Sequence, residues 1–152
     1  MQGAGIVEAV RQHLALFGER SNVAAELQVV GQESRMGPAD EHALLRIVQE
    51  ALNNIAKHAQ ATHAAVTIEF DLDRVRCTIR DDGLGFDPAI LPTEPTLTGG
   101  MGMDTMRSRA AEAGGAFEIE SRPGEGTIVT VTLPLAPKEQ RAAVGAVDPA
   151  SL

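Results

Sequence analysis

Aromatic side chains are scarce in this chain: its 152 residues include no tryptophan, no tyrosine and four phenylalanines. Stacking of bases on aromatic rings, by which many proteins bind single-stranded nucleic acid, is therefore not expected. Basic residues are also few, with 13 Lys and Arg against 21 Asp and Glu, and the net charge of −8 disfavours binding of duplex phosphates. We expect no direct contact with nucleic acid.

Cysteine and long apolar runs are equally scarce. A single cysteine excludes an internal disulfide framework and a cysteine zinc cluster. No apolar run approaches the roughly 20 residues that span a bilayer, and no basic segment precedes an apolar one at the start of the chain, as a signal peptide requires. We expect a cytoplasmic globular domain, either free or as the cytoplasmic part of a membrane-anchored protein, with no membrane segment in this chain.

The first half of the chain shows helical periodicity on both sides of one short strand. Apolar residues recur every three or four positions from Ile6 to Phe17, which predicts a helix ending near Gly18. Residues 23–30 read as a strand and 31–37 as a polar loop. A second, longer helix is predicted from Pro38 to about Ala59, with Asp40 as its N-terminal cap.

The second half alternates like paired strands. Apolar and polar residues alternate over 66–70 and 75–79, then again over 117–120 and 129–133 around a turn at 123–126. A helix from Met103 to Ala113, closed by Gly114 and Gly115, lies between the two strand pairs. This order predicts an α+β fold, a two-layer α/β sandwich whose mixed, mostly antiparallel sheet has its helices on one face. We assign residues 1–137 to the domain and 138–152 to a flexible tail.

Two oxygen-bearing side chains are one turn apart on the second helix. The Glu50 carboxylate and the Asn54 amide are at spacing i, i+4 and project side by side. Such oxygens suit Mg²⁺, which takes one or two protein ligands and completes its octahedron with phosphates and water. Lys57 and His58 extend the same face by another turn. The alternative is a solvated helix face without a site.

Asp81-Asp82-Gly83-Leu84-Gly85 directly follows a predicted strand. A carboxylate at that strand end can accept a hydrogen bond from the exocyclic amine of adenine, and glycines let a base approach the backbone. Alternation predicts that Asp82 faces away from Asp81. The alternative is an Asp/Gly turn leaving the strand. Farther along, Gly99-Gly100-Met101-Gly102 precedes a helix whose free N–H groups can bind phosphate.

The order of these motifs is more specific than any one of them. The segment Glu50-Ala51-Leu52-Asn53-Asn54-Ile55-Ala56-Lys57-His58-Ala59 is followed by Asp81-x-Gly83-x-Gly85, by Gly100-x-Gly102-Met103 and by Gly124-x-Gly126-Thr127. This series resembles the N, G1, G2 and terminal Gly-Thr boxes of the GHKL ATPase superfamily. Met106 to Ala110 further resembles histidine kinases related to nitrate sensors and desaturase (membrane-fluidity) sensors.

The resemblance implies a Bergerat ATP-binding fold and a role for each matching residue. Asn54 is expected to bind Mg²⁺, Lys57 to contact phosphate, Asp81 to bind the adenine amine, and Thr127 to assist Asp81 through water. Glu50 is expected to polarise the incoming phosphoacceptor histidine. The remaining motif positions are expected to contact the nucleotide or shape its pocket: His58, Gly83, Gly85, Gly100, Gly102 and Met103. Residues 86–99 are expected to form a lid over the nucleotide.

One component of such a kinase is not matched. No histidine outside the N box is followed by an acidic residue, which is the arrangement of the phosphoacceptor in these kinases. We therefore expect an ATP-binding catalytic domain that donates the γ-phosphoryl group of Mg-ATP to a histidine on a separate dimerisation domain. The further partner is then a response regulator with a DNA-binding output domain. The alternatives are an anti-sigma-factor-type serine kinase and a regulatory nucleotide-binding module without catalysis.

Overall fold

The computed structural model describes residues 5–84 and 103–135. In these ranges the helices and strands follow the predicted order. The helical elements are α1 (Ile6–Ser21), α2 (Pro38–Asn54), the π-helix η1 (Ile55–Ala59) and α4 (Met103–Glu112). The strands are β1 (Ala24–Val30), β2 (His63–Phe70), β3 (Arg74–Asp81), β4 (Ala116–Ser121) and β5 (Thr127–Pro134).

The strands form one mixed sheet in the order β1-β2-β3-β5-β4. β1 pairs with β2 in parallel, whereas the β2–β3, β3–β5 and β4–β5 pairs are antiparallel. The parallel pair is possible because α2 and η1 lie between β1 and β2 in the chain and supply the crossover that parallel strands need. The sheet is therefore mixed and mostly antiparallel, as the sequence predicts.

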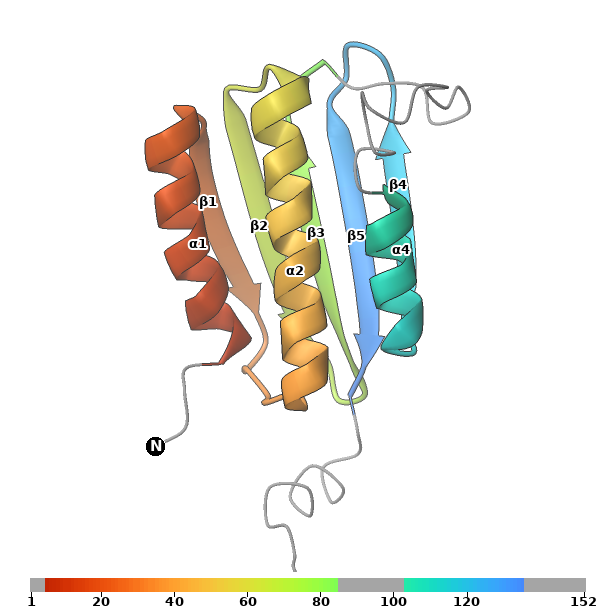
Figure 1. The fold of residues 1–152 in the computed structure, drawn as a ribbon. Coiled ribbons are helices and arrows are strands. Elements are labelled where there is room, and N and C mark those ends of the chain that lie inside the picture. The colour runs from red at the N-terminus through yellow and green to blue at the C-terminus, as the bar shows by residue number, and fades with distance from the viewer. Residues whose placement is uncertain (1–4, 85–102, 136–152) are drawn as a thin grey trace, which may run out of the picture.

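The helices α1, α2 and α4 all lie on one face of the sheet, which makes two layers (Figure 1). Alternate strand residues face these helices and are buried, for example Val66 and Ile68 on β2 and Val131 on β5. They pack against the apolar sides of the helices, such as Leu44 and Val48 on α2. Burial of this one continuous apolar layer is the main contribution to the stability of the fold. The α+β sandwich prediction is confirmed.

Two predicted helix ends are corrected. Helix α1 continues past Gly18 to Ser21, because Asn22, in the left-handed conformation at φ 60°, terminates it and donates its N–H to the Gly18 carbonyl. Helix α2 is capped by Gly37 with Pro38 at its first position, and no side chain caps it, so the Asp40 cap was wrong. Glu41 instead accepts a hydrogen bond from the Met36 N–H at 3.1 Å.

The end of α4 agrees with the prediction, since Gly114 at φ 80° and Gly115 follow its last turn. Cys77 and Met106 are both buried in the core. The loop at 86–99 that we expect to be a lid lies outside the described residues. So does the tail at 138–152, and neither prediction is tested here.

Candidate nucleotide site

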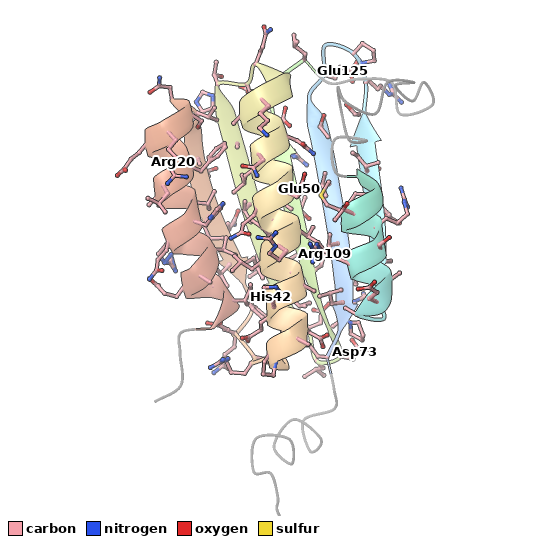
Figure 2. The ribbon with its side chains drawn as sticks, in the orientation of Figure 1. Arg20, His42, Glu50, Asp73, Arg109 and Glu125 are labelled. Carbon is pink, nitrogen blue, oxygen red and sulfur yellow. The ribbon has the colours of Figure 1, made fainter. Side chains whose placement is uncertain are left out.

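Three elements that carry predicted site residues meet at one end of the sandwich. Helix α2 ends there at Asn54, β3 ends there at Asp81, and β5 begins there at Thr127 (upper end in Figure 1). In Figure 2, Glu125 marks this end and Asp73 marks the opposite one. We call them the site end and the far end. The fold thus brings to one end residues that are 27 to 73 positions apart in the chain.

Asp81 is the one buried charged residue in the described part of the chain, with 7% of its surface exposed. It occupies the helix-covered face because it continues the alternation of Cys77 and Ile79. Its Oδ1 accepts a hydrogen bond of 2.7 Å from the Gly83 N–H. Burial raises the pKa of Asp81, while the Gly83 bond lowers it and the neighbouring Asp82 charge raises it further. A buried carboxyl with a perturbed pKa at a strand end is typical of a functional position.

Thr127 lies directly opposite Asp81, because the two residues are register partners on β5 and β3. The Thr127 hydroxyl is 2.9 Å from the Ser121 hydroxyl, which in turn donates to the Gly126 carbonyl at 2.9 Å. Gly126 has φ 79°, and a Cβ there would collide with the Asp81 carbonyl oxygen. The terminal Gly-Thr pair therefore packs against the Asp81 backbone in a way that only glycine allows.

Asp82 lies on the opposite side of the strand end, as alternation predicts, and is exposed. Its Oδ1 accepts hydrogen bonds from the N–H groups of Thr62 at 2.8 Å and His63 at 3.0 Å. Its Oδ2 accepts a third from the Thr62 hydroxyl at 2.7 Å. These donors, led by the Thr62 side chain, hold the pKa of Asp82 well below its ordinary value. Sequence reasoning missed this cluster, because only the β2–β3 register shows that residues 62 and 82 meet.

On α2, Glu50 and Asn54 are one turn apart and both are half-buried. Figure 2 shows Glu50 on the upper half of α2, toward the site end. Asn54 is the last α-helical residue, and Ile55 to Ala59 continue as a π-helix. The helix predicted to run to about Ala59 thus changes type at Ile55, because a π-turn has an additional residue in each hydrogen-bonded ring. That Lys57 and His58 extend the face of Glu50 and Asn54 stays a prediction. Lys57 is exposed, and the His58 side chain lies outside what the structure describes.

The remaining predicted positions are only partly described. Gly83 is buried beside Asp81, and Met103 is the first residue of α4, although its side chain is not described. Gly85, Gly100 and Gly102 lie outside the described residues. Within the described ranges, no group of three or more His, Cys, Asp or Glu side chains gathers as a metal site, and no helix is long and apolar enough to cross a membrane.

Comparison with known families adds a direct match. The model of the family described as histidine kinase-, DNA gyrase B- and HSP90-like ATPases matches residues 39–137. The matched range begins in α2 and extends past β5, so it includes Glu50, Asn54, Asp81 and Thr127.

Several curated relatives are sensor kinases. The signal transduction histidine-protein kinase/phosphatase DegS of Brevibacillus brevis is 31% identical over 135 residues, which are 89% of this chain and 34% of that protein. The sensor histidine kinase YxjM of Bacillus subtilis is 36% identical over 128 residues, 84% of this chain and 30% of that protein. The chain thus spans about a third of the length of these relatives.

Solved structures show the same fold. A blue-light activated histidine kinase of Erythrobacter litoralis superposes with a TM-score of 0.66 at 19% identity, covering 90% of this chain and 43% of that chain. The mycobacterial sensor histidine kinase MprB superposes with a TM-score of 0.65 at 20% identity, covering 88% of this chain and 97% of that chain. At such identities the likeness concerns the fold alone.

Proposed function

The chain belongs to the family of histidine kinase-, DNA gyrase B- and HSP90-like ATPases, and from this premise we propose that it is the ATP-binding catalytic domain of a sensor histidine kinase. The observation that carries the proposal is Asp81, a buried carboxyl at a strand end with Gly83 beside it and Thr127 opposite. An ionised carboxylate only accepts hydrogen bonds, and the exocyclic amine of adenine is a donor of the matching kind. Asp81 therefore binds the base.

The triphosphate is then held toward the end of α2. Asn54 offers an amide oxygen there and Glu50 a carboxylate one turn earlier, which suits Mg²⁺ because this ion needs few protein ligands. Mg²⁺ bound with the nucleotide neutralises charge on the phosphate oxygens during transfer. Lys57, exposed on η1, supplies an ammonium group for the phosphates, and Gly85, Gly100 and Gly102 complete the pocket.

Transfer of the γ-phosphoryl group requires a nucleophile that this chain does not supply by itself. We assign that role to a histidine on a dimerisation domain of the same kinase, and to Glu50 the polarisation of that histidine for in-line attack. A response regulator with a DNA-binding output domain then accepts the phosphoryl group. The relatives' names support the kinase part of this proposal, since they call those proteins histidine kinases, and both proteins are about three times as long as this chain.

The experiment that tests this function is phosphoryl transfer from [γ-³²P]ATP with Mg²⁺ present. We expect no label on this chain alone, and acid-labile label on a separately purified dimerisation domain of a sensor histidine kinase once the chain is added. Asn54→Ala should abolish most of that transfer because a metal ligand is removed. Acid-labile label on the chain alone would contradict the inference that the phosphoacceptor histidine lies on another domain. Acid-stable label on an added protein would instead favour a serine kinase.

A further inference from the structure

Asp82 joins two segments that are 20 residues apart in the chain, the end of β3 and the residues just before β2. The geometry points to Asp82 as a positioning residue. It fixes the end of the helix formed by α2 and η1, which carries Asn54 and Lys57 on the phosphate side of the site, relative to the base-binding Asp81. This inference rests on the proposed function and adds to it a residue that does not itself touch the nucleotide.

Asp82 is well placed to act at a distance and badly placed to bind the base. Asp81 faces the helix-covered side of the sheet, whereas Asp82 lies on the other side and is exposed. All three of its short contacts go to Thr62 and His63, at 2.7 to 3.0 Å. Two longer links go to His63: the Asp82 N–H donates to the His63 carbonyl at 3.3 Å, and the His63 Nδ1 lies 3.3 Å from Asp82 Oδ2. An effect of Asp82 on the phosphate side of the site must therefore pass through these residues.

The anchored segment is short and leads straight to the phosphate side of the site. Helix η1 ends at Ala59 and β2 begins at His63, so only residues 60–62 connect them. Gln60 is in the left-handed conformation at φ 52°, which turns the chain sharply out of the helix. Because Thr62 is bonded through both its N–H and its hydroxyl, the helix end has little freedom relative to β3. Without that anchor, ordering Lys57 around a triphosphate costs additional conformational entropy.

Asp81, in contrast, is held by contacts that do not involve Asp82. It pairs with Thr127 across the β3–β5 ladder, its carboxylate accepts the Gly83 N–H, and its carbonyl lies where a Cβ on Gly126 would collide with it. Loss of the Asp82 anchor should therefore loosen the phosphate side and leave the base side in place. A ligand that touches both sides should lose affinity, and a ligand that touches only the base side should not.

The test compares adenosine with a non-hydrolysable ATP analogue in the presence of Mg²⁺, each displacing a fluorescent nucleotide. We expect Asp82→Ala to weaken the ATP analogue roughly tenfold and adenosine by about twofold at most. Asp82→Asn should restore both, because its amide oxygen can accept the two backbone N–H groups while its NH₂ donates to the Thr62 hydroxyl.

The matched control is Glu41→Ala at the far end. Glu41 also accepts a backbone N–H, from Met36 at 3.1 Å, and an arginine N–H, from Arg35 at 3.0 Å. Its loss should lower the midpoint of thermal unfolding without changing the affinity for either ligand. If Asp82→Ala does not fold, Thr62→Val replaces it, and we expect the same pattern with about a threefold loss for the ATP analogue.

The outcomes separate this inference from the proposed function. Wild-type protein that binds neither ligand overturns both. Wild-type protein that binds ATP, together with an Asp82→Ala variant that binds it equally well, overturns the positioning role alone. An equal loss for adenosine and the ATP analogue, or a similar loss in Glu41→Ala, also overturns it, because either result reduces Asp82 to general support of the fold.

Discussion

The two ends of the sandwich use the same backbone devices for different purposes. At the far end, Gly31 has φ 84° and a Cβ there would lie 2.6 Å from the Phe70 carbonyl oxygen; at the site end, Gly126 has φ 79° and contacts the Asp81 carbonyl oxygen in the same way. Each end also has a carboxylate that accepts a backbone N–H, Glu41 at the far end and Asp82 at the site end. Close turns and anchoring carboxylates are thus part of this fold in general.

The site end differs by two features that cost stability. It buries the Asp81 carboxyl, whose desolvation raises its pKa, and it ends α2 in a π-helix instead of a regular C-terminal cap. The far end has neither among its described residues, since α2 begins there with Pro38 at its first position, a favourable start for a helix. The comparison shows that the unfavourable features are concentrated where a ligand can compensate for them.

The largest expected effect is a loss of stability when alanine replaces either of the two glycines, one at each end of the sandwich. Gly126→Ala and Gly31→Ala each force an alanine into the left-handed region against a carbonyl oxygen, so both should lower the free energy of unfolding by about 2 kcal/mol or more. Urea unfolding measures that loss. Only Gly126→Ala should also weaken ATP binding, by about tenfold or more, because it displaces Asp81. Calorimetry on the folded protein measures the ATP affinity of both variants. Equal affinities would contradict the claim that only the site end contributes to ATP binding.

Much of this arrangement could be predicted from the sequence where the signal is local. Alternation along β3 correctly predicted that Asp82 faces away from Asp81, because a strand has a strict period of two. The Asp40 cap was wrong, because the backbone at Gly37 already begins the helix and Glu41 turns back to Met36. Which of several neighbouring polar side chains caps a helix depends on the backbone geometry at its first turn, which the local sequence does not determine.

Contacts between distant residues could not be predicted in this way. The Thr62–Asp82 anchor depends on the β2–β3 register, and a one-residue shift would turn Asp82 toward the helices. The π-helix at Ile55–Ala59 is also absent from the periodicity, because its apolar residues match an α-helix equally well. The motifs therefore predict which residues form the site, whereas the positions of Lys57 and Thr62 relative to them come from tertiary structure.

A smaller effect is expected in the pH dependence of the two aspartates. Burial favours the neutral form of Asp81, so its stability contribution is largest below the unfolded pKa and is lost as pH rises through the raised folded pKa. Asp82, whose pKa is lowered, stabilises the fold above its unfolded pKa and loses that contribution as pH falls. Asp81→Asn should therefore be more stable than wild type at neutral pH. Asp82→Asn should be slightly less stable there. Thermal unfolding from acid to neutral pH checks both signs, and identical profiles for the two variants would contradict them.

The central claim, that Asp81 binds adenine and Asp82 does not, is tested most directly by competition of ATP and GTP against a fluorescent nucleotide. Guanine presents a carbonyl where adenine presents the amine, so the Asp81 carboxylate meets an acceptor with no proton between them. We predict a preference for ATP of roughly tenfold to several hundredfold in the wild type. Asp81→Asn should erode it, because an amide can present either a donor or an acceptor, while Asp82→Asn should keep it. Loss of selectivity in Asp82→Asn together with its retention in Asp81→Asn would contradict the account.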